Sequence, residues 1–156
     1  MNYIAMKEQY LTKEGLAELQ GKLRELKTTR RREIAGAIHT AKEQGDLSEN
    51  AEYQSAKEEQ NRIELEIADL ETTLKNAQVI TRASKDAVSV GNRVVLKCND
   101  KSIEYRIVGS NEADPLAGKI SNESPMGQAL LGKKKGEKIT IPTLAGDKDC
   151  VVVEIH

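Results

Sequence analysis

Apolar residues in the first half of the chain recur at alternating intervals of three and four residues. This spacing places them along one stripe of an α-helix, where they can pack against a partner helix. Two helices are predicted in this way, and the second has the more regular stripe. Its members are Tyr53, Ala56, Gln60, Ile63, Ile67, Leu70, Leu74 and Ala77.

The first predicted helix carries two apolar stripes that are out of phase. Arg30 falls where the first stripe would continue, and a change of phase of this kind alters the supercoiling of paired helices without ending the helix. We expect Thr12 to cap the start of this helix, although Gly15 replaces the glutamate of a capping box. The stripes consist of Leu16, Leu19, Leu23 and Leu26, and then Ile34, Ala37, Ile38 and Ala41.

Two apolar stripes joined by a short turn predict an antiparallel coiled-coil hairpin. Gly45 would end the first helix and Asp46 would cap the second. With about 1.5 Å per residue, roughly thirty residues in each arm give a rod of about 45 Å. The first arm is basic and the second acidic, which favours the antiparallel partner. We assign Arg30, Arg31 and Arg32 to that pairing, and contact with a nucleic acid or an acidic protein face is the alternative.

The apolar period changes from helical to alternating beyond a stretch of small polar residues at 83–87. Ser124 and Pro125 resemble the start of a short helix that stops at Gly132. Strands around a single short helix form a small domain, so the fold class is α+β, with the hairpin at 1–83 and a globular domain at 84–156. The predicted strands are 88–90, 93–98, 103–109, 138–141 and 150–155.

Four carboxylates gather at the predicted bend of the hairpin, and residues 43–56 contain no Lys or Arg. Such a concentration of like charge suggests a cation or a basic partner. Asp46 and Glu49 also fit a capping box, which would explain them without any ligand. Carboxylate oxygens suit Mg²⁺, but two of them complete a site only with ligands from another molecule. The four acids are Glu43, Asp46, Glu49 and Glu52.

Composition excludes several classes of function. The 156 residues include no Trp, no Phe and four Tyr, which is too few aromatic rings for a base-stacking surface. With a net charge of −1, the chain is also not basic enough to neutralise a nucleic-acid backbone. Neither a membrane-spanning run nor a signal sequence is evident, so we expect a cytoplasmic protein that does not enter a membrane.

The remaining reactive residues do not predict an enzyme. Cys98 and Cys150 are interpreted as two buried small residues of a reduced protein, and neighbouring positions on adjacent strands are the alternative. His39 and His156 have no nucleophile paired with them. The basic turn at 132–136 lacks the spacing and the strand-to-helix context of a phosphate-binding loop.

Several segments of the chain resemble the bacterial Gre transcript-cleavage factors, and the GreA type in particular. The most specific match is the run Gly45-Asp46-Leu47-Ser48-Glu49-Asn50-Ala51-Glu52-Tyr53 at the bend. Other matches follow in order along nearly the whole chain. They include 11–15, 31–34, 76–80, 105–109, 124–127 and 129–133.

The resemblance implies that the hairpin enters the secondary channel of bacterial RNA polymerase while an FKBP-like globular domain docks at the channel rim. Asp46 and Glu49, in the tip at 45–49, would share a Mg²⁺ ion with the polymerase, so that backtracked nascent RNA is cut near its 3′ end. Asn50, Tyr53 and Lys57 are second-rank candidates for orienting the tip or touching RNA. The factor would be a monomer without a cofactor of its own, and it would stimulate the polymerase rather than act as an enzyme.

Two other functions fit parts of the sequence. The hairpin could serve as a non-catalytic inhibitor of RNA polymerase in the same channel, or as a chaperone-like clamp. Prolyl isomerisation by the globular domain would need a pocket lined by aromatic residues, and Tyr105 alone is not enough to form one. The acidic tip and the resemblance favour the cleavage factor over both.

Overall fold

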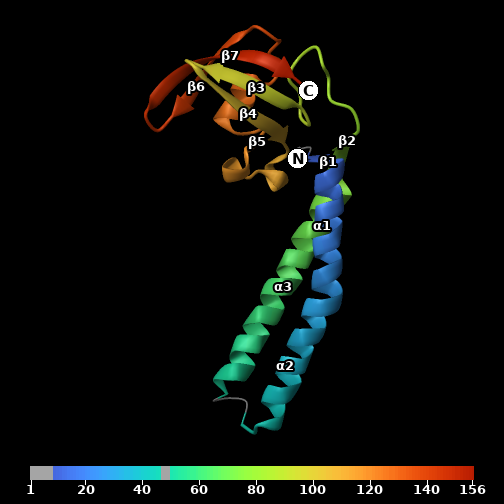
Figure 1. The fold of residues 1–156 in the computed structure, drawn as a ribbon. Helices are drawn as coiled ribbons and strands as arrows, with labels where there is room; N and C mark the ends of the chain where they lie inside the picture. Colours follow the sequence, from blue (N-terminus) through green and yellow to red (C-terminus); the bar gives the residue numbers. More distant parts are fainter. Residues whose placement is uncertain (1–8, 47–49) are drawn as a thin grey trace, which may run out of the picture. The chain divides into compact units, whose positions relative to one another are not determined.

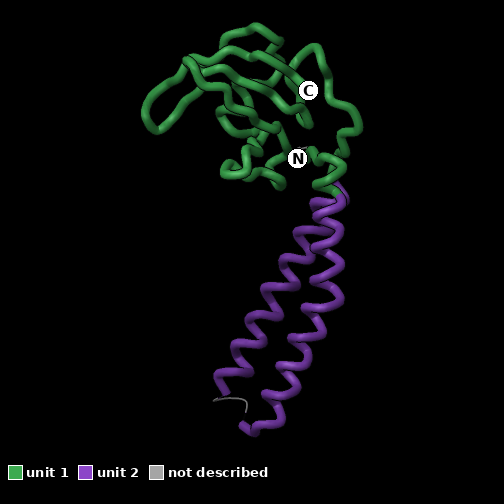
Figure 2. The backbone as a smooth tube through the Cα atoms, in the orientation of Figure 1, with its two compact units in different colours: residues 1–16, 77–156 green, residues 17–76 purple. Residues whose placement is uncertain are grey.

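The computed structural model describes residues 9–46 and 50–156, which belong to two compact units (Figure 2). One unit comprises residues 17–76, and the other combines residues up to 16 with 77–156. The units therefore divide the chain at other residues than the predicted division into 1–83 and 84–156. The reason is that residues 77–80, which follow the second arm, pair with residues 9–12, which precede the first arm. The α+β fold class is confirmed.

The helical unit contains two antiparallel arms (Figure 1). The first arm consists of α1 (Lys13–Glu25), η1 (Leu26–Arg30) and α2 (Arg31–Glu43), and the second is α3 (Ala51–Asn76). The predicted stripes meet in an apolar core formed by Leu26, Ile34, Ile63, Ile67 and Leu70. The predicted hairpin is confirmed, and burial of these stripes is what stabilises helices that are mostly polar elsewhere.

The predicted change of phase coincides with η1, which is a turn of π-helix. A π-turn holds more residues than an α-turn and so rotates the following residues about the helix axis. Leu26 at its start and Ile34 beyond its end are both buried, while the half-buried Arg30 lies between them. The helix persists through the change of phase, as expected. The π-turn η1 rotates the second stripe onto the face that packs against α3.

The globular unit is built on a five-stranded sheet with the order β5-β4-β3-β7-β6 (Figure 1). Its neighbouring strands are antiparallel except for β4 and β5, which are parallel. The predicted strands after residue 92 are confirmed, most of them with longer bounds. They are β3 (Arg93–Cys98), β4 (Lys101–Val108), β6 (Lys138–Thr143) and β7 (Gly146–Ile155). The sequence did not predict β5 (Lys119–Ser121).

The short helix predicted in the globular unit is α4 (Pro125–Leu130). Ser124 caps it as expected, because the Ser124 Oγ accepts a hydrogen bond of 3.0 Å from the Gly127 N–H. Leu130 is fully buried and joins Val94, Leu96 and Ile107 in the core of this unit. Two short 3₁₀ turns, η2 (Ser110–Glu112) and η3 (Pro115–Ala117), lie between β4 and β5.

A second, parallel pair of strands joins the two ends of the hairpin segment. β1 (Gln9–Thr12) precedes α1, and β2 (Ala77–Ile80) follows α3. Thr12 and Ile80 are register partners at one end of this ladder. The sequence did not predict these strands, because each has four residues and its partner lies beyond the whole hairpin.

One predicted strand is wrong. Residues 88–90 form no strand, although Val88 and Val90 are buried. The Val88 N–H instead donates to the Lys133 carbonyl at 2.8 Å, and Gly91, with φ of +98°, turns the chain into β3. An apolar alternation of three residues is too short to distinguish a strand from a buried loop.

The interpretation of Cys98 and Cys150 as unpaired residues is also wrong. They are register partners on β3 and β7 and form a disulfide. The alternative of neighbours on adjacent strands is therefore correct. Among the described residues, no helix is both long enough and apolar enough to cross a membrane.

Candidate functional site

The bend between α2 and α3 begins where Gly45 reverses the chain. The Gln44 N–H donates to the Ala41 carbonyl at 3.3 Å and closes the last turn of α2. Gly45 has φ of +115°, in the region that side chains disfavour, so glycine suits this position. Asp46 follows directly and is exposed. Glu49, the other predicted tip acid, lies outside the described residues.

Asn50 fixes the far side of the bend by bonding both arms. Its Oδ1 accepts a hydrogen bond of 3.1 Å from the Tyr53 N–H, which makes Asn50 the N-cap of α3. Its Nδ2 donates to the Ala41 carbonyl at 2.9 Å, a group that lies in the last turn of α2. One amide therefore pairs an N–H at the start of α3, adds a second hydrogen bond to a carbonyl in the last turn of α2, and ties the two helix ends together.

The prediction that Asp46 caps α3 is wrong. The helix begins at Ala51, so the cap is Asn50 and Asp46 lies four residues before it. Asp46 and Glu49 matched the capping-box pattern more fully than Asn50 did, and for this reason the sequence pointed to the wrong residue. Capping of α3 therefore does not explain why an aspartate stands at position 46.

Ion pairs between the arms hold the rest of the hairpin in register. The Arg31 guanidinium binds the Glu64 carboxylate through two hydrogen bonds of 2.7 and 2.5 Å. Lys22 pairs with Glu66 at 2.6 Å, and Lys27 pairs with Glu71. The predicted pairing of a basic arm with an acidic arm is confirmed for these residues.

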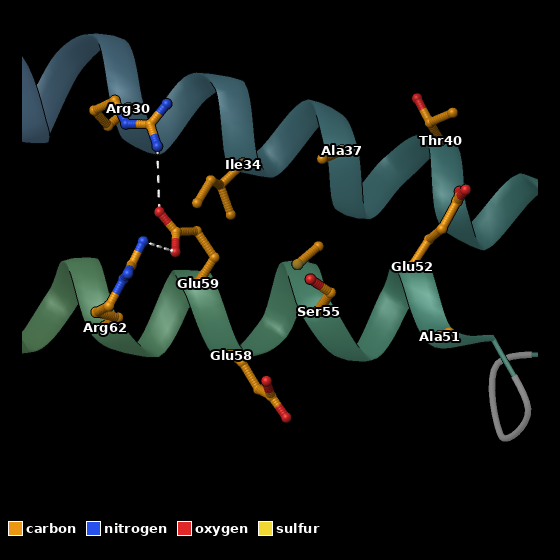
Figure 3. A pocket seen from close by; sticks show the side chains of 11 residues that line it. Arg30, Ile34, Ala37, Thr40, Ala51, Glu52, Ser55, Glu58, Glu59 and Arg62 are labelled. Atoms are coloured by element: carbon orange, nitrogen blue, oxygen red, sulfur yellow. Dashed lines mark hydrogen bonds and ion pairs between the residues drawn. The ribbon is translucent and has the colours of Figure 1, made fainter.

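Arg30 and Arg62 share one carboxylate near the middle of the hairpin. Glu59 binds Arg62 on its own helix and accepts a hydrogen bond of 3.2 Å from Arg30 across the arms (Figure 3). The hydrogen bond from Arg62 is the main reason that the pKa of Glu59 lies below its ordinary value. The hydrogen bonds from Arg31 likewise lower the pKa of Glu64. Both carboxylates therefore favour the ionised form.

Between this cluster and the bend, the arms enclose a cavity of about 950 Å³. Small side chains such as Ala37, Ala51 and Ser55 line it, and Figure 3 shows Glu52 pointing across it toward α2. Ala37 belongs to the predicted stripe but is exposed. An alanine side chain is too short to fill the space between the arms here, so the seam is less tightly packed near the bend than at Ile63 and Ile67.

The second-rank candidates lie on the first turns of α3. Tyr53 and Lys57 are both half-buried. The Lys57 Nζ donates to the Gln60 side chain at 2.8 Å on the same helix. Asn50 bonds both arms at the bend. Its role in orienting the tip, like contact of Tyr53 or Lys57 with RNA, stays a prediction.

The donor chemistry of the bend fits Mg²⁺ only in part. An exposed Asp carboxylate is a suitable ligand for this ion. Within residues 9–46 and 50–156, however, no group of three or more His, Cys, Asp or Glu side chains is arranged to hold a metal ion. The described bend can therefore contribute a ligand to a site whose other ligands come from elsewhere.

Two family models together match nearly the whole chain. Residues 9–79 match the N-terminal domain of the transcription elongation factors, and residues 83–156 match the C-terminal domain of GreA and GreB. Transcription elongation factor GreA of Clostridium novyi is 48% identical over 96% of this chain and 97% of its own. The corresponding factor of Listeria welshimeri is 47% identical over 93% of each chain.

Solved structures of related proteins were also found. The crystal structure of GreA factor homolog 1 of Thermus thermophilus is 31% identical over 96% of this chain and 99% of its own, with a TM-score of 0.45. The hairpin with its acidic bend, the two family models and the similarity to the GreA factors of Clostridium novyi and Listeria welshimeri lead to the same assignment. The chain belongs to the GreA/GreB family of transcription elongation factors.

Proposed function

We propose that this factor inserts its hairpin into the secondary channel of RNA polymerase and stimulates the cleavage of backtracked nascent RNA. The globular unit, of the FKBP-like type that the resemblance implies, docks at the rim of the channel. The factor works as a monomer in the cytoplasm, where bacterial RNA polymerase acts. The observation that carries the proposal is the exposed Asp46, directly after the turn at Gly45, at a bend where Asn50 bonds the ends of both arms.

The chemistry requires a carboxylate that is held in place but still available. Asp46 and Glu49 provide oxygen ligands to the polymerase's own catalytic centre near the RNA 3′ end. A Mg²⁺ ion bound there supplies Lewis-acid stabilisation of the attacking and leaving oxygens. In this proposal the remaining ligands come from the polymerase, and the factor raises an activity that belongs to the polymerase.

The residues around the bend serve to limit its motion. Asn50 ties the last turn of α2 to the first turn of α3, and this lowers the number of conformations that Asp46 can adopt. Misplacing a catalytic ligand by about 1 Å can cost roughly a hundredfold in rate. A positioned tip is therefore part of the function and not only of the fold.

The test uses purified polymerase halted in a backtracked complex with Mg²⁺. The wild-type factor is expected to release a short 3′ RNA fragment, and Asp46→Asn to reduce this release at least about tenfold, because an amide is a poorer ligand. A matched control is Glu58→Gln, which removes one exposed charge from α3 away from the bend. Binding of each variant to polymerase is measured in parallel by competition.

Two outcomes would overturn the proposal. If the wild-type protein binds polymerase and releases no fragment, the hairpin is a channel-occupying inhibitor. If Asp46→Asn cleaves as well as the wild type, the assigned role of Asp46 is wrong.

A further inference from the structure

The disulfide of the globular unit lies at a position that reagents can approach from one side. Cys98 and Cys150 face each other across β3 and β7 and lie 52 positions apart in sequence. A cavity of about 320 Å³ borders this end of β3, and Cys98 is one of its lining residues. Cys98 keeps 8% of its surface exposed, whereas Cys150 keeps 2%. Cys98 lines this cavity and Cys150 does not, so the cavity offers an incoming reagent an approach from the Cys98 side.

The cavity is also charged in a way that favours thiolates. Its ionisable lining residues are Lys101 and Lys148, which are positive, and Asp100, which is negative. Two cations against one anion leave a net positive surrounding. Such surroundings attract an anionic thiolate and stabilise the thiolate that leaves when a disulfide breaks.

From these observations we infer that the Cys98–Cys150 bond is a reversible thiol–disulfide exchange site, attacked at Cys98 by a thiol reductant that enters the cavity. In the first step, the reductant's thiolate bonds to the Cys98 Sγ, and Cys150 leaves with the electron pair of the broken S–S bond and takes up a proton. A second thiol then attacks the reductant's sulfur in the mixed disulfide and releases Cys98. Two electrons and two protons pass to the protein, and two thiols of the reductant become a disulfide.

Reduction would change the stability of the globular unit. A crosslink that closes a loop of this length restricts the unfolded chain and raises stability through that restriction. The linked strands are the two central neighbours of the sheet, and both contribute to its core. Their hydrogen bonds remain after reduction, so we expect a folded but less stable unit, with a melting temperature lower by roughly 10 °C or more. This inference concerns a separate site and holds whether or not the factor stimulates RNA cleavage.

The site of attack is tested on the wild-type protein with reduced glutathione as the probe. The reaction is stopped with N-ethylmaleimide, and the peptides containing each cysteine are identified by mass spectrometry. We expect glutathione on Cys98 and maleimide on Cys150, in at least tenfold excess over the opposite pattern. Equal amounts of the two patterns, or glutathione mainly on Cys150, would overturn the assignment.

A second measurement separates exchange in the folded protein from exchange after unfolding. The rate of reduction by dithiothreitol is followed at low urea concentrations, below the unfolding transition. A rate that hardly changes with urea supports attack through the cavity, because no large surface is exposed. A rate that rises steeply, in parallel with unfolding, would show that the disulfide is inaccessible in the folded state and would refute the proposal.

The role of charge is tested by substitution. Replacing Lys101 and Lys148 together by Gln is expected to slow reduction about threefold to tenfold, because the thiolates lose their positive surroundings. The matched control is Lys134→Gln with Lys135→Gln, which removes the same charge from an exposed turn outside the cavity. Equal rates in the two double variants would contradict this role for the cavity lysines.

Discussion

Asn50 combines two hydrogen bonds that different substitutions can separate. Asn50→Asp keeps the acceptor for the Tyr53 N–H but loses the donor to the Ala41 carbonyl, whereas Asn50→Ala loses both. We expect Asn50→Ala to lower the free energy of unfolding of the hairpin by about 1–2 kcal/mol, and Asn50→Asp by less. Helical circular dichroism during thermal melting measures both effects.

The same pair of variants tests whether Asn50 acts by positioning. If it does, RNA cleavage should fall in the order wild type, Asn50→Asp, Asn50→Ala, while addition of more factor should not restore the rate. Loss of cleavage that disappears at saturating factor would instead indicate weaker binding to polymerase. Unchanged cleavage by Asn50→Ala would remove the residue from the proposed mechanism.

Asn92 is a buried polar residue whose hydrogen bonds are all made inside the globular unit. Its Oδ1 accepts from the Ser89 N–H at 2.7 Å, and its Nδ2 donates to the carbonyls of Ser84 and His156 at 2.8 and 3.0 Å. Asn92→Ala would remove three hydrogen bonds of a fully buried amide, so we expect the free energy of unfolding to fall by about 2–4 kcal/mol.

Urea unfolding of Asn92→Ala measures this loss. The control is Asn111→Ala, because Asn111 is exposed and its side-chain amide donates to the Gln9 side chain at 3.2 Å. We expect a change within about 0.5 kcal/mol for the control. A similar small change for Asn92→Ala would mean that water replaces its hydrogen bonds without cost.

At the scale of elements, the start of α1 depends on a carboxylate from a distant turn. The Thr12 Oγ1 accepts from the Gly15 N–H at 3.0 Å, as the predicted cap requires. The Glu112 carboxylate of η2 accepts from the Thr12 N–H at 2.7 Å and from the Thr12 hydroxyl at 2.5 Å. Glu112 thus takes the place of the glutamate that a capping box would have at position 15.

Gly15 is explained by this arrangement, since a Cβ there would overlap the Glu112 carboxyl. We expect Gly15→Ala to destabilise the protein, although alanine favours a helix interior by about 1 kcal/mol over glycine. Gly21→Ala, on the same helix with no atoms near the added Cβ, should stabilise it by about that amount. In a Glu112→Ala background, Gly15→Ala should no longer destabilise. Thermal melting of Gly15→Ala, Gly21→Ala, Glu112→Ala and the double variant Gly15→Ala with Glu112→Ala tests this. A stabilising effect of Gly15→Ala in the wild-type background would contradict the role of Glu112.

The ion pairs between the arms predict how the hairpin responds to acid. The pKa values of Glu59 and Glu64 are lowered in the folded state by hydrogen bonds from Arg62 and Arg31. Fewer protons are then bound in the folded than in the unfolded state, so this stabilisation is present above the ordinary glutamate pKa of about 4.3. It is lost as the pH falls through the lowered values.

We therefore expect the melting temperature of the hairpin to be nearly constant from about pH 7 to 5 and to fall below about pH 4. Glu64→Gln should flatten part of this fall, whereas Glu18→Gln, which removes an exposed carboxylate from α1 outside the ion pairs described above, should not. Helical circular dichroism over this pH range provides the measurement. A melting temperature independent of pH would show that the pairs contribute nothing to stability.

At the scale of the whole molecule, the sequence predicted what depends on local periodicity. Ile63, Ile67 and Leu70 lie three or four residues apart, so their common face is visible without a structure. The pairing of Gln9 with Ala77 is not, because it depends on the chain returning after the whole hairpin. The bond between Thr12 and Glu112 likewise joins residues 100 positions apart.

The residues of the candidate site also differ in whether a local sequence signal identifies them. Asp46 is identified by a concentration of acids at a predicted turn, which is a local signal. The bond between Asn50 and Ala41 depends on how the two arms meet, so the sequence ranked Asn50 second. The disulfide depends on the register of β3 and β7, which alternation alone does not determine.

The two units have separate apolar cores, and this predicts that they lose stability independently. The core of the helical unit includes Ile67, that of the globular unit includes Leu96, and the two clusters share no residue. Replacing either residue by alanine should cost about 2–5 kcal/mol in its own unit. We expect Ile67→Ala to speed hydrogen exchange of amides in α3 and η1, and Leu96→Ala to speed exchange in β3, β4 and β7, because local unfolding follows the contacts that are lost.

Peptide-resolved hydrogen exchange measured by mass spectrometry distinguishes the two responses. Equal acceleration of both units by either substitution would mean that they unfold as one cooperative body. A factor built that way could not lose the order of its globular unit, for example on reduction of the disulfide, without loosening the hairpin as well.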